Sequence, residues 1–300
     1  MRALRPLRAR WVFAVVASTF FAGGSLATSS DAAARPITKP PVASGSRYLA
    51  LGDSITFGFR EGNTVPPPNY NDPSSFIGYP QLVGSALRLK VTNAACPGET
   101  SSSFINTSAP SNGCTNSPNP IVFRSSFPLH VRYTGSQLGF AVKYLRSNRN
   151  VRLVSLEIGA NDLLRCVRTT RDGCASPSEE QAVLSVLRGN IRTILSTIRH
   201  KARYRGQLVI LTQYSPDYTS AFLTNGVMAL NSTVVAAAKP FRVLVANGFG
   251  QFYQGSLHSG SSPCTAGLLT QLGAPGRCGV HPSYGGQSLL ALAVETAVRH

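Results

Sequence analysis

Five short apolar segments recur along the chain. A stretch with helical spacing of apolar residues follows each of them. The segments predicted as strands are Arg47–Leu51, Val91–Ala95, Val151–Ile158, Gln207–Tyr214 and Arg242–Ala246. The stretches predicted as helices are Pro80–Leu89, Gly135–Ser147, Ser178–Lys201, Thr219–Ala238 and Pro282–Arg299. Near-continuous hydrophobicity in a strand is typical of burial on both faces. The alternation therefore predicts one α/β domain, a parallel sheet covered by helices on both faces, with its site at the carboxyl ends of the strands.

The N-terminus has the organisation of a secretory signal peptide. Four arginines lie within the first ten residues, an apolar run begins at Trp11, and small residues follow at positions 32–34. The run is short for a membrane span, and no later segment has about 18 uninterrupted apolar residues. We expect a signal peptide over residues 1–34, a linker over 35–46 and one domain over 47–300. The chain is then secreted and has no transmembrane anchor; an uncleaved anchor is the alternative.

Cysteine usage agrees with export. Six cysteines follow the predicted signal peptide, and an even number in an exported chain predicts disulfides. They lie at Cys96, Cys114, Cys166, Cys174, Cys264 and Cys278. Their grouping into three local pairs favours nearest-neighbour pairing, although the sequence does not prove it. No metal or cofactor is expected, since no C-x-x-C or H-E-x-x-H spacing occurs.

The chain is strongly basic, with a formal net charge of +17. Such a charge favours association with an anionic lipid surface, an acidic polymer or nucleic acid, but it does not determine the fold. A basic surface without a specific acidic partner is the favoured interpretation. Aromatic residues are not interleaved with arginine as in RNA-binding modules, so no specific nucleic-acid partner is expected. We expect a monomer.

Four short motifs flank the predicted strands and the last helix. They are GDSITFG over residues 52–58, CPGET over 96–100, GAND over 159–162 and GVHP over 279–282. By itself Ser54 resembles a common cap or turn residue. The combination is more informative, because it brings a serine, a glycine, an asparagine and a histidine to one end of the predicted sheet.

In this order the motifs resemble the four conserved blocks of the SGNH (GDSL) hydrolase superfamily, and the resemblance covers essentially the whole predicted domain. It implies a flavodoxin-like three-layer α/β/α sandwich with a central parallel sheet of about five strands. It also implies that Ser54 is the nucleophile of an esterase or lipase and that His281 is its base. The Ser54 N–H, the Gly98 N–H and the Asn161 side chain then form the oxyanion hole. Acyl transfer requires such an activated hydroxyl and donors aimed at the developing charge.

One position departs from the family pattern. Members usually carry Asp three residues before the histidine, whereas Cys278 stands there in this chain. Three interpretations follow: a main-chain carbonyl near residues 277–280 orients His281, a carboxylate from elsewhere does so, or the enzyme is impaired. The first is favoured, because some secreted members resemble this chain in relying on a Ser-His dyad with a main-chain acceptor.

The substrate is less constrained than the chemistry. Ten aromatic residues in loops or at element ends are candidates for an acyl pocket, which favours a lipid or fatty-acyl ester over another small ester substrate: Tyr70, Phe76, Tyr79, Phe104, Phe123, Phe127, Tyr133, Phe249, Phe252 and Tyr253. Half of them are expected to pack beneath the loops. A polysaccharide O-deacetylase of the same fold and a catalytically impaired glycan- or lipid-binding protein are the alternatives.

Overall fold

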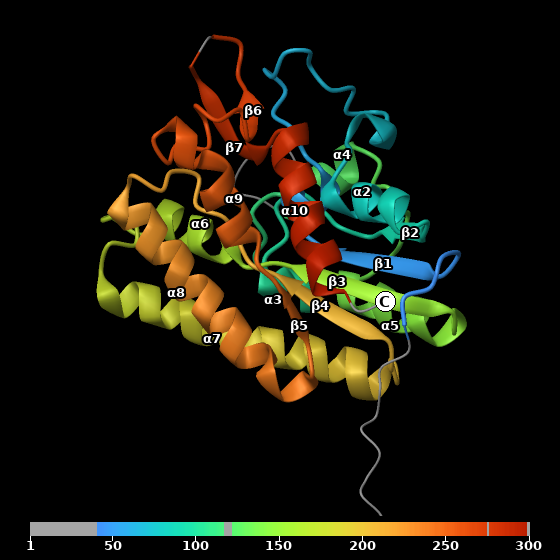
Figure 1. Ribbon diagram of the computed structural model, residues 1–300. Coiled ribbons are helices and arrows are strands. Elements are labelled where there is room, and N and C mark those ends of the chain that lie inside the picture. Colours follow the sequence, from blue (N-terminus) through green and yellow to red (C-terminus); the bar gives the residue numbers. More distant parts are fainter. Residues whose placement is uncertain (1–40, 117–121, 275, 299–300) are drawn as a thin grey trace, which may run out of the picture. The chain divides into compact units, whose positions relative to one another are not determined.

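Five parallel strands form the central sheet of the computed structural model, in the order β2-β1-β3-β4-β5 (Figure 1). They are β1 (Arg47–Gly52), β2 (Lys90–Asn93), β3 (Val151–Glu157), β4 (Gln207–Leu211) and β5 (Leu244–Ala246). All five predicted strands are present, although β4 ends earlier and β5 begins later than predicted. The later start of β5 has a local cause, because Arg242 adopts a left-handed backbone conformation with φ of 53°.

The structure describes residues 41–116, 122–274 and 276–298. The predicted signal peptide and the first part of the predicted linker lie outside this range, so both stay predictions. Within the described part of the linker, Val42 is buried in the hydrophobic core and the Gly45 N–H donates to the Arg88 carbonyl at 2.8 Å. Packing therefore begins before Arg47, because Val42 supplies an apolar side chain to the core.

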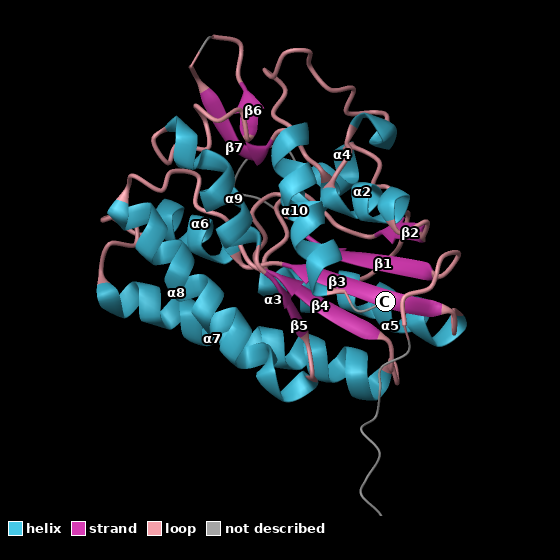
Figure 2. Cartoon of the chain, viewed as in Figure 1, coloured by secondary structure: helices cyan, strands magenta, loops and turns pink. Residues whose placement is uncertain are grey.

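Helices cover both faces of the sheet, as the cartoon in Figure 2 shows. One face carries α3 (Ser101–Ile105), α5 (Gln137–Ser147), α7 (Pro177–Ser196) and α8 (Ala221–Ala238). The other carries α2 (Tyr79–Ala86), α9 (Gly248–Ser256) and α10 (Tyr284–Ala297). Three further helices lie in the connections: α1 (Ser54–Phe57), α4 (Phe123–Ser126) and α6 (Ala160–Thr169).

Alternation along the strands explains the two apolar clusters that lie on opposite faces of the sheet. In β1, Leu49 and Leu51 pack into one apolar cluster, whereas Tyr48 and Ala50 pack into the other. Successive strand side chains point to opposite faces, so a strand between two helical layers is apolar throughout. The three-layer α/β/α sandwich with a parallel sheet is thus confirmed.

Helix α8 and the turn that follows it, Ala221–Phe241, are long and apolar enough to cross a membrane by length and composition, with a mean hydropathy of 1.4. Among the described helices it alone meets that criterion. It packs against α7 and supplies Leu230, Val234 and Ala237 to the core. The helix therefore covers one face of the sheet with part of its apolar surface, and 33% of its apolar window is buried.

A short antiparallel hairpin of β6 (Leu269–Gln271) and β7 (Cys278–Pro282) precedes α10 and was not predicted. The loop after α1 pairs with it, through a bridge between Thr64 and Leu272 and a 2.8 Å bond from the Gly273 N–H to the Asn63 carbonyl. The hairpin matters because β7 carries His281. The last helix begins after it, where the Ser283 side chain caps α10 by accepting from the Gly286 N–H.

Three disulfides join the cysteines in the nearest-neighbour pattern. They are Cys96–Cys114, Cys166–Cys174 and Cys264–Cys278. The first closes the loop after β2, the second spans the end of α6, and the third ties β7 to the segment before β6. Each bridge therefore restrains a connection at the carboxyl side of the sheet.

Candidate active site

Ser54 begins α1 directly after β1, at the carboxyl end of that strand. The preceding Asp53 caps this short helix, because its Oδ1 accepts from the Ile55 N–H at 3.0 Å. Gln287 of α10 fixes the same helix by donating to the Ile55 carbonyl at 3.0 Å. These two hydrogen bonds fix the position of Ser54. The residue is 9% exposed, so it borders the surface.

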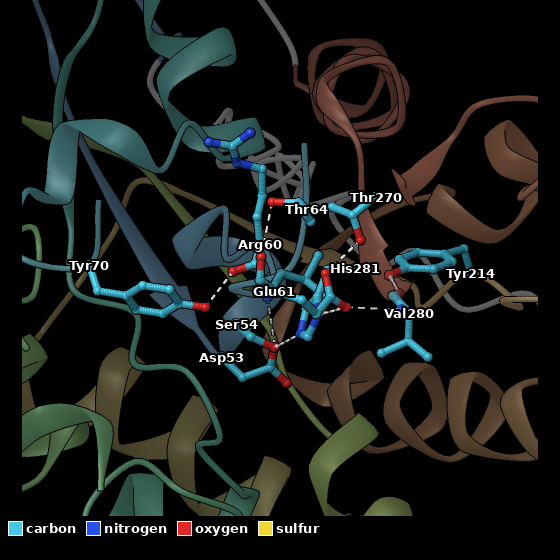
Figure 3. A network of polar contacts seen from close by, with 11 residues as sticks. Asp53, Ser54, Arg60, Glu61, Thr64, Tyr70, Tyr214, Thr270, Val280 and His281 are labelled. Atoms are coloured by element: carbon cyan, nitrogen blue, oxygen red, sulfur yellow. Dashed lines mark hydrogen bonds and ion pairs between the residues drawn. The ribbon is translucent and has the colours of Figure 1, made fainter. Parts of the chain in front are cut away.

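His281 faces Ser54 from β7 (Figure 3). Its Nε2 lies 3.0 Å from the Ser54 Oγ, which brings together two residues that are 227 positions apart. The ring of Phe59 packs edge-on against the imidazole, with 4.8 Å between ring centroids. The sequence-predicted pair is thus in hydrogen-bonding contact, in the geometry that a base needs to take a hydroxyl proton.

The partner of the other histidine nitrogen is Glu61. Its Oε1 lies 2.7 Å from His281 Nδ1 and also accepts from the Val280 N–H at 3.1 Å. Its Oε2 accepts from the Thr270 hydroxyl at 2.6 Å. The favoured expectation of a main-chain carbonyl near residues 277–280 was therefore wrong, and the alternative of a carboxylate from elsewhere is the arrangement found. Cys278 is bonded to Cys264 and takes no part in orienting the ring.

Glu61 carries a charge at neutral pH. Burial raises the pKa of its carboxyl, but the hydrogen bond and the charge of His281 outweigh that effect and hold the pKa at about 2. The contact with His281 becomes an ion pair when the imidazole is protonated. A carboxylate fixed at both oxygens sets the imidazole tautomer, with the proton on Nδ1 and a free lone pair on Nε2 facing Ser54.

Asn161 lies at the start of α6, beyond β3. Its Nδ2 donates to Asp53 Oδ2 at 3.0 Å, and its Oδ1 accepts from Asn112 Nδ2 at 2.7 Å. Arg168 in turn donates to the Asn112 Oδ1. An amide nitrogen has two protons, so one Nδ2 proton of Asn161 remains available beside the nucleophile turn.

Gly98 occupies a position that only glycine suits. Its φ is +81°, and a Cβ there would lie 2.7 Å from the Asn112 carbonyl oxygen. Its N–H and that of Ser54 donate to no residue in the described ranges. The predicted oxyanion donors are thus the Ser54 N–H, the Gly98 N–H and one Nδ2 proton of Asn161, none of which has an acceptor in the described structure. The Asn161 side chain contacts Asp53, which precedes Ser54, and Asn112.

Asp162 and Asp53 support these groups, in the structural roles expected for them. Asp162 accepts from both the Ser101 N–H and the Ser101 hydroxyl, at 2.9 and 2.6 Å. Burial raises the pKa of Asp162 to about 6 against these bonds. Asp53 is fully buried and hydrogen-bonds to the carboxyl of Glu157, which also accepts from Thr56 at 3.1 Å and from Gln213.

The Asp53–Glu157 pair predicts a pH dependence of stability. Burial raises the pKa of Asp53 to about 6 and raises that of Glu157 further. Above about pH 4 the unfolded chain loses these protons while the folded chain keeps them, so the free energy of unfolding falls as pH rises through this range. Glu157→Gln removes one titrating group. We expect the melting temperature of the wild type to fall relative to Glu157→Gln between pH 4 and pH 8; parallel profiles would contradict shared burial of the pair.

The ten candidate aromatic residues separate into distinct groups. Tyr79, Phe104 and Phe252 have no exposed surface and belong to the two cores. Tyr70, Phe123 and Phe127 join Phe59 in a continuous group, here called the aromatic wall, that reaches His281. Phe123 is buried in a third apolar cluster, and the other three rings are partly buried against it. Phe76 packs behind it against Phe57, while Phe249 and Tyr253 pack with Tyr218 elsewhere. Tyr133 packs against Phe140 of α5.

Comparisons with known proteins agree with this geometry. The profile of the GDSL-like Lipase/Acylhydrolase family matches residues 50–289, and a search of curated proteins found no match. Among solved structures, phospholipase A1 from Streptomyces albidoflavus NA297 is similar, with 19% identity, a TM-score of 0.54, and coverage of 85% of this chain and 100% of that one.

Two further structures share the fold. The lipase Lip_vut3 from a goat rumen metagenome has 16% identity, a TM-score of 0.53, and coverage of 84% of this chain and 97% of its own. The acetylxylan esterase Axe2 from Geobacillus stearothermophilus has 15% identity, a TM-score of 0.52, and coverage of 87% and 97%. The family match extends over most of the chain and includes Ser54, Asn161 and His281. The chain therefore belongs to the GDSL-like lipase/acylhydrolase family of carboxylic-ester hydrolases.

Proposed function

We propose that this protein is a secreted serine esterase or lipase that cleaves esters with an apolar acyl group through an acyl-enzyme on Ser54. The observation that carries the proposal is the continuous contact from Ser54 through His281 to Glu61, at 3.0 and 2.7 Å. Export rests on the predicted signal peptide and is supported by the three disulfides, which persist in oxidising compartments.

The reaction proceeds in two steps. His281 Nε2 takes the Ser54 proton while Oγ attacks the ester carbonyl carbon, and the resulting imidazolium then protonates the leaving alcohol. Water repeats the sequence on the acyl-enzyme and releases the carboxylic acid. Throughout, Glu61 accepts the Nδ1 proton in a hydrogen bond and stabilises the imidazolium charge without becoming protonated itself.

Asn161 donates to the oxyanion in this mechanism. Asn161→Ala is expected to lower kcat by about 100- to 1000-fold, the usual loss for one oxyanion donor, with a smaller change in KM. Steady-state hydrolysis of a nitrophenyl ester measures both constants. Asn148→Ala, which removes a side chain that caps α5, is the matched control and should leave kcat within about twofold. A loss confined to KM would show that Asn161 binds substrate and does not stabilise charge.

The aromatic wall supports an apolar acyl group. Phe59 contacts the imidazole, and Tyr70, Phe123 and Phe127 continue from it with centroid separations of 5.0 to 6.3 Å. Phe59, Tyr70 and Phe127 are only partly buried, and such apolar surface favours substrates that bury a hydrocarbon chain against it. A polysaccharide O-deacetylase would present only an acetyl group there. A non-catalytic binding protein is less favoured, because the serine, the base and its carboxylate are all in contact.

Nitrophenyl esters of two to sixteen acyl carbons test the proposal on the oxidised mature protein. We expect hydrolysis that a serine-directed phosphonate blocks, with kcat/KM rising from acetyl toward longer chains. A strict preference for acetyl would favour the deacetylase. Turnover that resists the phosphonate would contradict the serine mechanism, whatever the chain length.

A further inference from the structure

A groove of about 970 Å³ lies between α5 and the segment that follows α4. None of Ser54, Glu61, Asn161 or His281 lines it. Its volume is in the range of clefts that bind ligands in proteins. It shares only Phe127 with the aromatic wall, so its chemistry is separate from that of the active site.

Three of the aromatic side chains that line this groove pack against one another. Tyr133 and Phe140 are 4.9 Å apart between ring centroids, and Phe140 and Tyr144 are 5.7 Å apart. Strand β2 and the loop after it fix the two tyrosines, since the Tyr133 hydroxyl donates to the Ala94 carbonyl at 3.0 Å and the Tyr144 hydroxyl contacts Thr92 Oγ1 at 2.7 Å. The rings are thus held in place before any ligand arrives, which lowers the entropic cost of binding.

Positive charge lines the same groove without a compensating carboxylate. Arg132 and Lys143 are exposed and form no ion pair with any described residue. Arg124 lies 4.2 Å over the Tyr133 ring and donates to the Tyr133 and Gly135 carbonyls, which fixes a third cation. No Asp or Glu occurs among the described residues that line the groove. The uncompensated cations favour an anionic ligand.

Part of the remaining lining is polar and distinguishes the kind of anion. Beside Phe127, Pro128, Leu129 and Gly139, small hydroxyl and amide side chains line the groove: Ser125, Ser126, Thr134, Ser147 and Asn148. None of the large apolar residues that the described surface exposes lies in the groove, so it offers little for insertion into a lipid layer. An acidic carbohydrate matches this lining. Aromatic rings can contact the apolar faces of sugars, hydroxyl and amide side chains can hydrogen-bond to sugar hydroxyl groups, and cations can bind carboxylates.

We propose that this groove binds an anionic polysaccharide and retains the enzyme on it. The sugar rings contact Phe140 and Tyr144, and uronate carboxylates bind Arg132 and Lys143. This function is independent of the proposed ester hydrolysis, because no residue of the groove takes part in the reaction at Ser54.

Polygalacturonate is the probe, with the wild-type mature protein and two double variants. Arg132→Ala/Lys143→Ala removes the two exposed cations of the groove. Arg188→Ala/Arg192→Ala removes two exposed cations from α7 and changes the net charge equally. Titration calorimetry at about 0.1 M salt is expected to show affinity at least about tenfold weaker for the groove variant and within about twofold of wild type for the control. Both variants should keep wild-type turnover of a soluble nitrophenyl ester, which verifies their folding.

Three outcomes would overturn the proposal. Equal weakening in both double variants would show non-specific attraction to the basic surface. Absence of polygalacturonate binding by the wild type would leave the groove without this ligand. Dependence of binding to phosphatidylglycerol vesicles on Arg132 and Lys143, alone or together with polygalacturonate binding, would assign the groove to anionic surfaces in general. A neutral galactan serves as the uncharged control and should bind at least about tenfold more weakly than polygalacturonate.

Discussion

Ser54→Ala is expected to lower kcat for nitrophenyl ester hydrolysis by about a million-fold, which leaves only the background of the assay. The loss is this large because the Ser54 Oγ is the atom that forms the acyl bond, and His281 has no other hydroxyl in its hydrogen-bonding contacts. Active-site titration with a phosphonate should label one serine in the wild type and none in the variant, as mass spectrometry of the intact protein can measure.

The matched control for this variant is Ser288→Ala on the exposed side of α10. It should keep wild-type kcat and phosphonate labelling. Because the Ser54 hydroxyl is small and borders the surface, Ser54→Ala should also keep the wild-type melting temperature within a few degrees. Substantial turnover by a folded Ser54→Ala protein would remove the acyl-enzyme mechanism.

The second large effect concerns Glu61, whose role the sequence did not indicate. Glu61→Gln is expected to lower kcat by about 100- to 10,000-fold, because a neutral amide no longer stabilises the imidazolium or selects its tautomer. Glutamine has nearly the same shape and can still contact Thr270 and Val280, so KM should change little. Steady-state kinetics separates the two constants. Glu180→Gln on α7 is the control and should behave as wild type.

Acid titration of stability gives an independent test of the Glu61 contact. The pKa of Glu61 is lowered in the folded protein to about 2, so its contribution to the free energy of unfolding is present above about pH 4.5 and is lost as pH falls toward 2. The difference in melting temperature between wild type and Glu61→Gln should therefore shrink in this window. An unchanged kcat in Glu61→Gln would contradict this role of Glu61 and would favour a main-chain carbonyl as the group that orients His281.

Local sequence patterns were sufficient to predict the sheet and to name most residues of the candidate site. Strands such as Val151–Glu157 are apolar on both faces, and that property is visible in the residues themselves. Ser54 and Asn161 each stand in a short motif beyond a parallel strand, so their proximity follows from the parallel topology. His281 was found from its motif before the last helix, although the antiparallel strand that carries it was not predicted.

Glu61 could not be found in the same way. It lies in a loop without periodicity, and its partner His281 is 220 positions away. The one available signal was the small number of acidic residues. The whole chain has only 12, and Glu61 is one that follows the turn that carries Ser54. Hydropathy also cannot separate a core aromatic from one at the site, which is why Phe104 and Phe252 were mistaken for candidates of the pocket while Phe59 was overlooked.

Glu61 and His281 lie on two segments that are distant in sequence and that pair with each other through the bridge between Thr64 and Leu272. The loop after α1 supplies only the carboxylate of Glu61, and the β6–β7 hairpin supplies only the imidazole of His281. Protein engineers who exchange specificity loops between relatives should therefore transfer these two segments as one module, because a chimera that inherits only one of them inherits a histidine or a carboxylate without its counterpart.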